Sequence, residues 1–176
     1  MSGQAFEIRI CEPLKEGALY DFYKRNNICE AGYGKELSEV VLQHEGVWVA
    51  AYDNGELVGF ARALHDGLQG VIMEIDLDLR YQSENTFQNG CFIESDPHAI
   101  AKDMVLALLK ELRTRGCYFF SIVIFEDATE KEFYKSLGFY EHSGHRDYII
   151  DARPFVPGGN ERGAKIDAAD LRRLRR

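Results

Sequence analysis

The stretch Glu132-Phe133-Tyr134-Lys135-Ser136-Leu137-Gly138-Phe139 decides the fold of this chain. Phe133 and Leu137 are four residues apart, a spacing that puts both side chains on one face of a helix. Gly138 is well placed to end that helix in a left-handed conformation. Tyr134 lies one position round from the apolar stripe, so its hydroxyl is free to point elsewhere. The stretch therefore predicts a short helix that turns directly into a strand, with a phenol at the corner that can donate a proton.

The residues before this stretch predict a strand and a long helix. The apolar run 117–125 is typical of a strand that is buried on both faces. Before it, Asp96 and Pro97 form an N-cap followed by a proline at the first helical position. The apolar spacing continues that helix to about Arg115. After the opening stretch, residues 147–151 predict a last strand.

The first half of the chain predicts a β-hairpin between helices and a further strand. The expected elements are a strand at 6–10, helices at 14–26 and 35–44, and strands at 47–52 and 57–64. Asn54-Gly55 between the last two strands is a strong hairpin signal. The whole order predicts an α/β (mixed α+β) fold, with a mixed, mostly antiparallel sheet flanked by helices on both faces.

The strand predicted at 71–79 is unusual because acidic and apolar residues alternate along it. The acidic members are Glu74, Asp76 and Asp78, and the apolar ones are Met73, Ile75, Leu77 and Leu79. A period of two puts the three carboxylates on one face. Carboxylates crowded in this way raise the pKa of at least one of them, which suits a general base. The alternative is that they form only the solvated face of a half-exposed strand.

Length and composition predict one ordinary domain, which we place at residues 1–152 of the 176. No apolar run approaches the ~18 residues of a membrane span, and the N-terminus lacks the pattern of a signal peptide. The four cysteines show no Cys-x-x-Cys spacing, so reduced thiols in a cytoplasmic protein are expected. The net charge of −8 argues against general nucleic-acid binding.

Residues 153–176 differ from the rest in composition and charge. They hold seven basic and three acidic residues, which gives a net charge of +4. Because the whole chain carries −8, the remaining residues carry −12. Their prolines and glycines predict a linker, followed by a short basic helix at 165–176. This tail is expected either to be solvated or folded on its own acidic domain, or to dock on the partner subunit of a homodimer.

The order of elements and several motifs resemble the GNAT superfamily of acyl-CoA-dependent N-acetyltransferases. The most specific match is the stretch 132–139, which looks like the family's "F-Y-x-x-L-G-F" segment. The hairpin 47–63, with Leu57-Val58-Gly59-Phe60, looks like the family's second and third strands. The resemblance covers about residues 6–151 and implies the fold expected above.

The resemblance also implies a reaction and roles for particular residues. Acetyl would pass directly from acetyl-CoA to a primary amine, with Tyr134 as the acid for the departing thiolate. Glu74 or Asp76 would be the base that deprotonates the amine, with Asp78 as a third choice. The backbone amides near Leu77 and Leu79 would bind the oxyanion and the pantetheine arm. Carboxylates at the mouth favour a cationic acceptor, which Asp78 and Tyr33 would help to bind.

The segment 80–97 departs from the family's pattern for the loop that binds the cofactor diphosphate. It is longer than that loop, has one glycine, and carries Glu94 and Asp96 where the phosphates would lie. Three readings are open. The segment binds the cofactor in another way, the helix starts later, near residues 98–102, or cofactor binding has been lost. The residues that would serve the first reading are Arg80, Gln82, Gln88 and Gly90.

Two functions from different classes follow. The leading hypothesis is an N-acetyltransferase that acts on a small, cationic amine or an aminoacyl group. The alternative is a GNAT-fold protein that no longer transfers acetyl and binds or sequesters a cationic ligand, in a resistance, immunity or regulatory role. No metal site is expected, because His142 and His145 are three apart and alternate on a strand.

Overall fold

The computed structural model describes residues 6–28, 35, 38, 40–43, 46–124 and 131–142. These residues belong to a compact unit, Met1–Tyr140, except for Glu141 and His142, which begin a second unit, Glu141–Arg176. Tyr33, the strand expected at 147–151 and the tail at 153–176 lie outside the described residues. The domain boundary, the docking of the tail and the homodimer therefore stay predictions.

Five strands form one sheet in sequence order. They are β1 (Glu7–Ile10), β2 (Val47–Asp53), β3 (Glu56–His65), β4 (Gln69–Leu77) and β5 (Phe119–Ile122). The first three pairings are antiparallel and the pairing of β4 with β5 is parallel. This confirms the mixed, mostly antiparallel sheet. The β2–β3 turn has positive φ at Asn54 and Gly55 (49° and 83°), as a two-residue hairpin loop requires.

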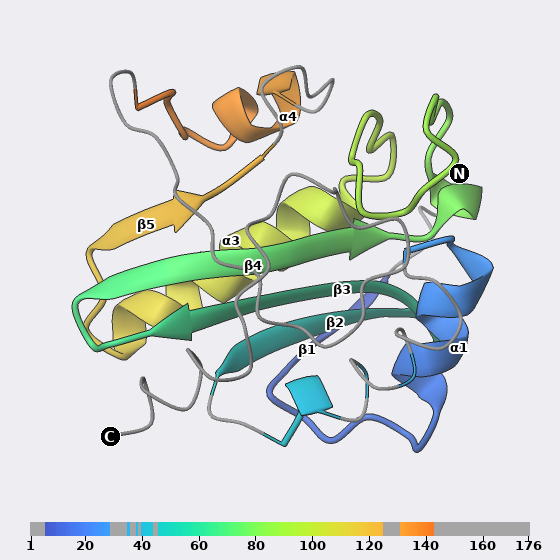
Figure 1. Ribbon diagram of the computed structural model, residues 1–176, viewed down its shortest axis with the longest axis horizontal. Helices are drawn as coiled ribbons and strands as arrows, with labels where there is room; N and C mark the ends of the chain where they lie inside the picture. Colours follow the sequence, from blue (N-terminus) through green and yellow to red (C-terminus); the bar gives the residue numbers. More distant parts are fainter. Residues whose placement is uncertain are drawn as a thin grey trace, which may run out of the picture. The chain divides into compact units, whose positions relative to one another are not determined.

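Helices cover both faces of the sheet (Figure 1). Helix α3 (Ile100–Thr114) packs on one face, and helix α1 (Ala18–Arg25) packs on the other through Phe22 and Tyr23, which are buried with Phe60 of β3. The expected helix 35–44 is helical at its described positions Lys35, Ser38, Val40 and Val41. A 3₁₀ turn, Leu79–Tyr81, follows β4.

The alternation expected along β4 holds only after Met73. Ala63 of β3 pairs with Ile72, whereas its neighbour Arg62 pairs with Glu74, so Met73 is the extra residue of a β-bulge. The bulge turns Ile72 into the core and leaves Met73 47% exposed. From Glu74 onward the carboxylates share one face and the apolar side chains the other.

Strand β5 differs from its expectation because it is short and partly exposed. The run 117–125 was expected to be buried on both faces, but Tyr118, Phe119 and Val123 are exposed. The parallel pairing with β4 ends at the pair Ile72 and Ile122, and β5 then diverges toward α4 (Figure 1). Among the described strands, β3 is therefore the only one that pairs with the last part of β4.

The stretch that decides the fold forms the short helix α4 (Lys131–Ser136). Gly138 has φ 90°, which confirms the left-handed stop. Phe133 and Leu137 are partly buried against the core, and Tyr134, 6% exposed, is the buried member of the helix. The long helix starts at Ile100, not at Pro97, which agrees with the later start that the sequence left open.

Candidate functional site

The acidic residues of β4 lie on the part of the strand that has lost its β5 partner. Glu74 and Asp76 follow the bulge, on the sheet face that α1 covers. In the plane of the sheet, the backbone N–H of Asp78 points toward β3 and donates to the Val58 carbonyl over 2.9 Å. Alternate residues of an antiparallel strand turn their backbone groups to opposite sides. The N–H groups of Ile75 and Leu77 therefore face away from β3, toward the diverging edge.

Glu74 is held by two side chains that the sequence analysis did not single out. The Tyr23 hydroxyl donates a hydrogen bond to Glu74 Oε2 over 2.8 Å, and the Arg62 guanidinium forms an ion pair with Oε1. The Glu74 side chain keeps 12% exposure. Burial, and next the charge of Glu74, raise the pKa of Tyr23 far above its usual range. Glu74 is thus an ion-paired, oriented carboxylate with limited access to water.

Asp76 is fully buried, and neither of its carboxylate oxygens has a hydrogen-bond partner among the residues that the structure describes. Burial is the main cause that raises the pKa of Asp76 well above 3.8, and the charge of Glu74 adds to it. The expectation that crowding raises the pKa of at least one carboxyl on this strand agrees with this direction. Asp76 therefore tends to hold a proton beside a charged Glu74.

Asp78 has the opposite environment, although its side chain is only 2% exposed. Burial alone would raise its pKa, but hydrogen bonds from Arg80 and Arg25 outweigh that effect and lower the pKa to about 2. The contacts are 2.8 Å from Arg25 Nε and 2.9 Å from Arg80 Nη2. The predicted role of Asp78 in binding a cationic acceptor has to compete with these two guanidinium groups.

The two backbone amides assigned to the oxyanion and the pantetheine arm are bonded within the chain. The N–H of Leu77 donates to the Gly90 carbonyl over 2.9 Å, and the N–H of Leu79 donates to Asn26 Oδ1 over 2.9 Å. The outward N–H of Ile75, two residues earlier, faces the same edge as that of Leu77. Ile75 is a donor position that the sequence analysis missed.

The loop residues assigned to cofactor binding follow β4, and their hydrogen bonds and ion pairs are made within the chain. Arg80 contacts Asp78 and Glu56. Gln82 is buried and donates to the Leu77 carbonyl over 3.2 Å. Gly90 donates its N–H to the Asn26 carbonyl over 2.9 Å.

The close approach of Gly90 explains why the position is a glycine. A Cβ there would lie 2.8 Å from the Leu77 carbonyl oxygen and 3.0 Å from Asn26 Cβ. The fourth loop residue assigned to the cofactor, Gln88, is exposed, and its side-chain amide donates to the Asn85 carbonyl over 2.7 Å.

The carboxylate of Asp96 binds backbone N–H groups at the start of α3. Asp96 Oδ1 accepts the N–H of Ile100 over 2.8 Å, and Oδ2 accepts the N–H of Lys102 over 2.9 Å. A pocket of about 250 Å³ lies beside it, between α3 and α4. Its lining is Ile93, Glu94, Ser95, Asp96, Ala99, Lys102, Phe133 and Ser136.

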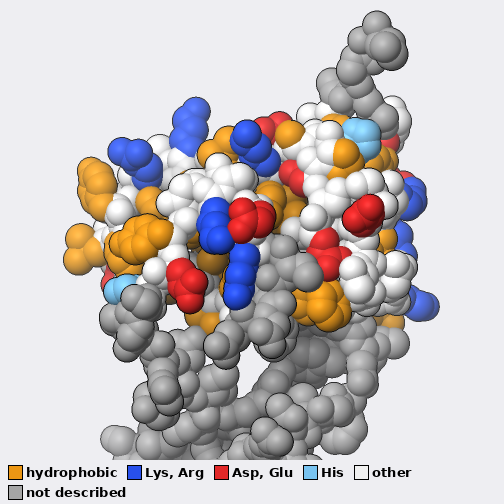
Figure 2. Space-filling model, turned by 90° about the horizontal axis from the view of Figure 1, so that it is seen from above, with side chains coloured by type: hydrophobic (Ala, Val, Ile, Leu, Met, Phe, Trp, Pro, Cys, Tyr) orange, Lys and Arg blue, Asp and Glu red, His pale blue; other side chains and the backbone are white. Residues whose placement is uncertain are grey.

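These contacts decide which parts of acetyl-CoA fit. The edge of β4 fits the acyl and pantetheine end, because the Ile75 N–H faces outward where β5 has diverged. The helix start does not fit a diphosphate, because a carboxylate already occupies its amides and a second one, Glu94, lines the pocket. Figure 2 shows one face of the molecule, seen from above relative to Figure 1, on which acidic side chains lie among basic ones.

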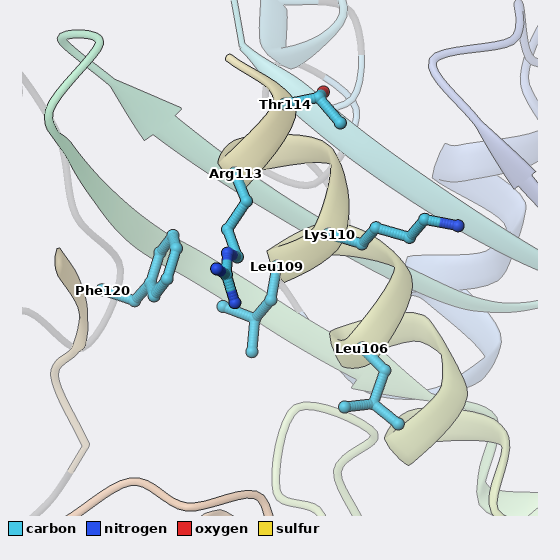
Figure 3. A pocket seen from close by; sticks show the side chains of 6 residues that line it. All are labelled: Leu106, Leu109, Lys110, Arg113, Thr114 and Phe120. Atoms are coloured by element: carbon cyan, nitrogen blue, oxygen red, sulfur yellow. The ribbon is translucent and has the colours of Figure 1, made fainter. Parts of the chain in front are cut away.

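A larger pocket lies away from all of these residues. It has a volume of about 560 Å³ and is lined by Leu106, Leu109, Lys110, Arg113, Thr114 and Phe120. Figure 3 shows Leu109 and Arg113 projecting from α3 toward Phe120 of β5. None of the candidate site residues lines this pocket, so its size does not make it the site.

The helices in the described part of the chain are all too short or too polar to span a membrane. Within the same residues, no group of three or more His, Cys, Asp or Glu side chains could hold a metal ion.

Comparisons with known proteins agree with the fold. A family-wide sequence profile described as "Acetyltransferase (GNAT) family" matches residues 14–139. A comparison with curated proteins gives no match.

Solved structures of acetyltransferases are similar to the chain in fold. A GNAT-family acetyltransferase from Streptococcus pneumoniae is 20% identical, with a TM-score of 0.64 over 85% of this chain and 99% of that one. An aminoglycoside N-acetyltransferase in complex with CoA is 17% identical, with a TM-score of 0.61 over 84% and 95%. A glucosamine-6-phosphate N-acetyltransferase from Arabidopsis thaliana is 14% identical, with a TM-score of 0.56 over 84% and 99%. At these identities the likeness concerns the fold alone.

Proposed function

The chain belongs to the GNAT acetyltransferase family, and on that premise we propose that it transfers an acetyl group from acetyl-CoA to the primary amine of a small cationic molecule or an aminoacyl group. Acetyl-CoA, when bound, supplies the activated acetyl thioester. The observation that carries the proposal is the part of β4 beyond its pairing with β5, where Glu74 and Asp76 lie next to an Ile75 N–H that faces away from β3. The rest of the chemistry concerns the chain's own side chains.

Glu74 is the proposed base, directly or through one water. It is charged, partly exposed and oriented by Tyr23 and Arg62, so it can take a proton from an ammonium group. Asp76 is the second candidate, but its buried carboxyl has to lose its own proton first. In our proposal Glu74 therefore accepts the proton of the ammonium group, and Asp76 is a neighbouring buried carboxyl that does not take part in the transfer.

Tyr134 is the proposed acid. It is buried in α4, against the core that includes α3, and its ring contacts Phe133 and Phe139. These aromatic contacts hold the ring in one place, as a positioned proton donor requires.

The net negative charge of the chain and the carboxylates of β4 support a cationic acceptor.

Two structurally similar proteins carry names or ligands that point to amino sugars. One is crystallised with a bisubstrate analogue that joins CoA to an acetylneamine, and another is named for glucosamine-6-phosphate. These substrates belong to those proteins. They guide the choice of a first panel for this chain, namely aminoglycosides, amino sugars and polyamines.

The second candidate function is a GNAT-fold protein that binds a cationic ligand without acetyl transfer. The hydrogen bonds of Gly90 and Asp96 favour it, because they occupy amides that a cofactor would otherwise use. It predicts binding of cationic amines with no binding of acetyl-CoA.

Calorimetry and turnover separate the two functions. We expect acetyl-CoA to bind at up to millimolar concentration, and Tyr134→Phe to lower kcat about 100-fold with little change in cofactor affinity. Tyr140→Phe is the matched control, because Tyr140 lies in the same segment and is 81% exposed. Absence of any heat with millimolar acetyl-CoA would overturn the transferase proposal in favour of the binding protein.

A further inference from the structure

The turn before α3 is built to place the Asp96 carboxylate over the start of the helix. The Ala99 N–H donates to the Asp96 carbonyl over 3.1 Å and closes a turn, after which the helix begins at Ile100. Ala99 itself adopts φ 58° and ψ 24°, a left-handed conformation that a non-glycine residue rarely takes. Because such a conformation costs energy, the surrounding contacts have to compensate for it.

Both oxygens of Asp96 are used at the helix start. The first four N–H groups of a helix lack partners within the helix, and they are what a bound anion would contact. Asp96 takes two such groups, from Ile100 and Lys102. A carboxylate and a phosphate compete for the same donors, and their like charges repel each other.

The neighbouring segment holds this arrangement in place. Ser83 and Ser95 share a hydrogen bond of 2.7 Å, and the backbone N–H of Thr86 donates to the Glu94 carboxylate. Glu94 lines the same pocket as Asp96, so a diphosphate entering there would meet two carboxylates and, among the described lining residues, one basic side chain, that of Lys102.

We propose that the Asp96 carboxylate occupies N–H groups at the start of α3 and thereby excludes a diphosphate from them. This chain would then recognise an acyl donor through its pantetheine arm alone. The statement about the donor rests on the proposed function, whereas the statement about Asp96 does not. The edge of β4 beside Ile75 takes the arm, and the phosphates of the donor are not bound at a helix start where Asp96 already accepts two of the N–H groups.

The first experiment uses inorganic pyrophosphate as the probe and needs no donor. The amide signals of Ile100 and Lys102 are followed by NMR in the wild-type chain and in Asp96→Ser, whose hydroxyl can still cap the helix. We expect no saturable shift in the wild type and a saturable shift in Asp96→Ser, with an affinity gain of about tenfold or more. A saturable shift in the wild type, or none in a folded Asp96→Ser, would overturn the occupancy by Asp96.

Two further variants make this result specific. Asp103→Asn removes one charge from an exposed residue in the first turn of the same helix, and we expect it to behave as the wild type. Asp96→Asn keeps an acceptor oxygen without the charge, and we expect a shift weaker than in Asp96→Ser. If Asp103→Asn gained pyrophosphate binding as Asp96→Ser does, general charge would explain the effect and the proposal would fail.

The second experiment compares CoA with pantetheine by calorimetry. We expect wild-type affinities for the two within about threefold, and in Asp96→Ser a gain of about tenfold for CoA alone. A wild-type preference for CoA of tenfold or more would overturn recognition through the arm. If the wild type and Asp96→Ser bind neither compound, both the proposed function and the recognition of the donor through its pantetheine arm are wrong. The pyrophosphate titration still decides the role of Asp96.

Discussion

The hydroxyl of Tyr23 donates a hydrogen bond of 2.8 Å to Oε2 of Glu74, and so connects helix α1 to the acidic strand β4. Arg62, on the neighbouring strand β3, holds the other oxygen of the same carboxylate. The proposed base is therefore oriented from two elements that are far apart in the sequence. Tyr23 lies outside the motifs that reveal the family, and Arg62, although it lies within the hairpin 47–63, carries no role predicted from the sequence.

Replacing Tyr23 with phenylalanine tests this connection. Tyr23→Phe keeps the ring beside Phe60 but removes a hydrogen bond to a charged group, so we expect the free energy of unfolding to fall by about 1–2 kcal/mol. Tyr20→Phe, on the same helix, is the control and should change it by less than about 0.5 kcal/mol. Urea unfolding measures both, and equal effects would show that the bond to Glu74 contributes nothing.

Asp76→Asn tests the buried carboxyl through pH. The unfolded chain releases this proton near 3.8, whereas the folded chain keeps it because the pKa of Asp76 is raised. The stability of the wild type therefore falls relative to that of the variant as the pH rises from about 4 to about 7. Urea unfolding of both proteins across this range measures the difference. A difference that stays constant with pH would contradict the raised pKa.

Asp78→Asn should show the opposite dependence on pH. The pKa of Asp78 is about 2 when folded, against an ordinary 3.8, so the ion pairs contribute about 2 kcal/mol. That contribution is present above about pH 4 and is lost as the pH falls toward 2. We expect the variant to be less stable than the wild type at pH 7, and the two to converge in acid.

Glu56→Gln is the matched control for Asp78. Glu56 contacts the same two arginines, 3.5 Å from Arg25 and 3.0 Å from Arg80, but its side chain is 51% exposed. Exposed ion pairs contribute little, so we expect a loss of less than about 1 kcal/mol at pH 7. A loss equal to that of Asp78→Asn would mean that burial of Asp78 does not matter.

Gly90→Ala should separate the loop from the end of β4. The added Cβ would lie 2.8 Å from the Leu77 carbonyl oxygen, so the loop has to shift and the hydrogen bond from the Leu77 N–H to Gly90 weakens. Hydrogen exchange at Leu77 should become at least about tenfold faster. The neighbouring amide of Asp78, bonded to Val58 of β3, is an internal control and should change much less.

The fold was predictable where local sequence determines it. A two-residue hairpin loop requires positive φ at both positions, which Asn54 and Gly55 adopt readily. Gly138 ends a helix in the same left-handed region. The hairpin and the corner after α4 could therefore be placed from residue types. The order of these local elements then led to the family. Strand β5 was misjudged because an apolar run does not reveal whether a second strand covers it.

The environment of the site was less predictable because it depends on one bulge. Without the bulge at Met73, the register of the β3–β4 hairpin would place Arg62 opposite Met73 and not opposite Glu74. Tyr23 reaches Glu74 only after α1 has packed on the sheet. The competition between Asp96 and a phosphate was visible in the sequence, since an acidic residue before a helix tends to bind the helix's own amides.

The release of free thiol from acetyl-CoA in the presence of a cationic amine tests the central proposal most directly. We predict a release that depends on the amine and that Glu74→Gln lowers by about 100-fold or more, with the fold and the acetyl-CoA affinity retained. Release that is independent of the amine, or equal in the wild type and Glu74→Gln, would contradict acetyl transfer through the carboxylate of β4.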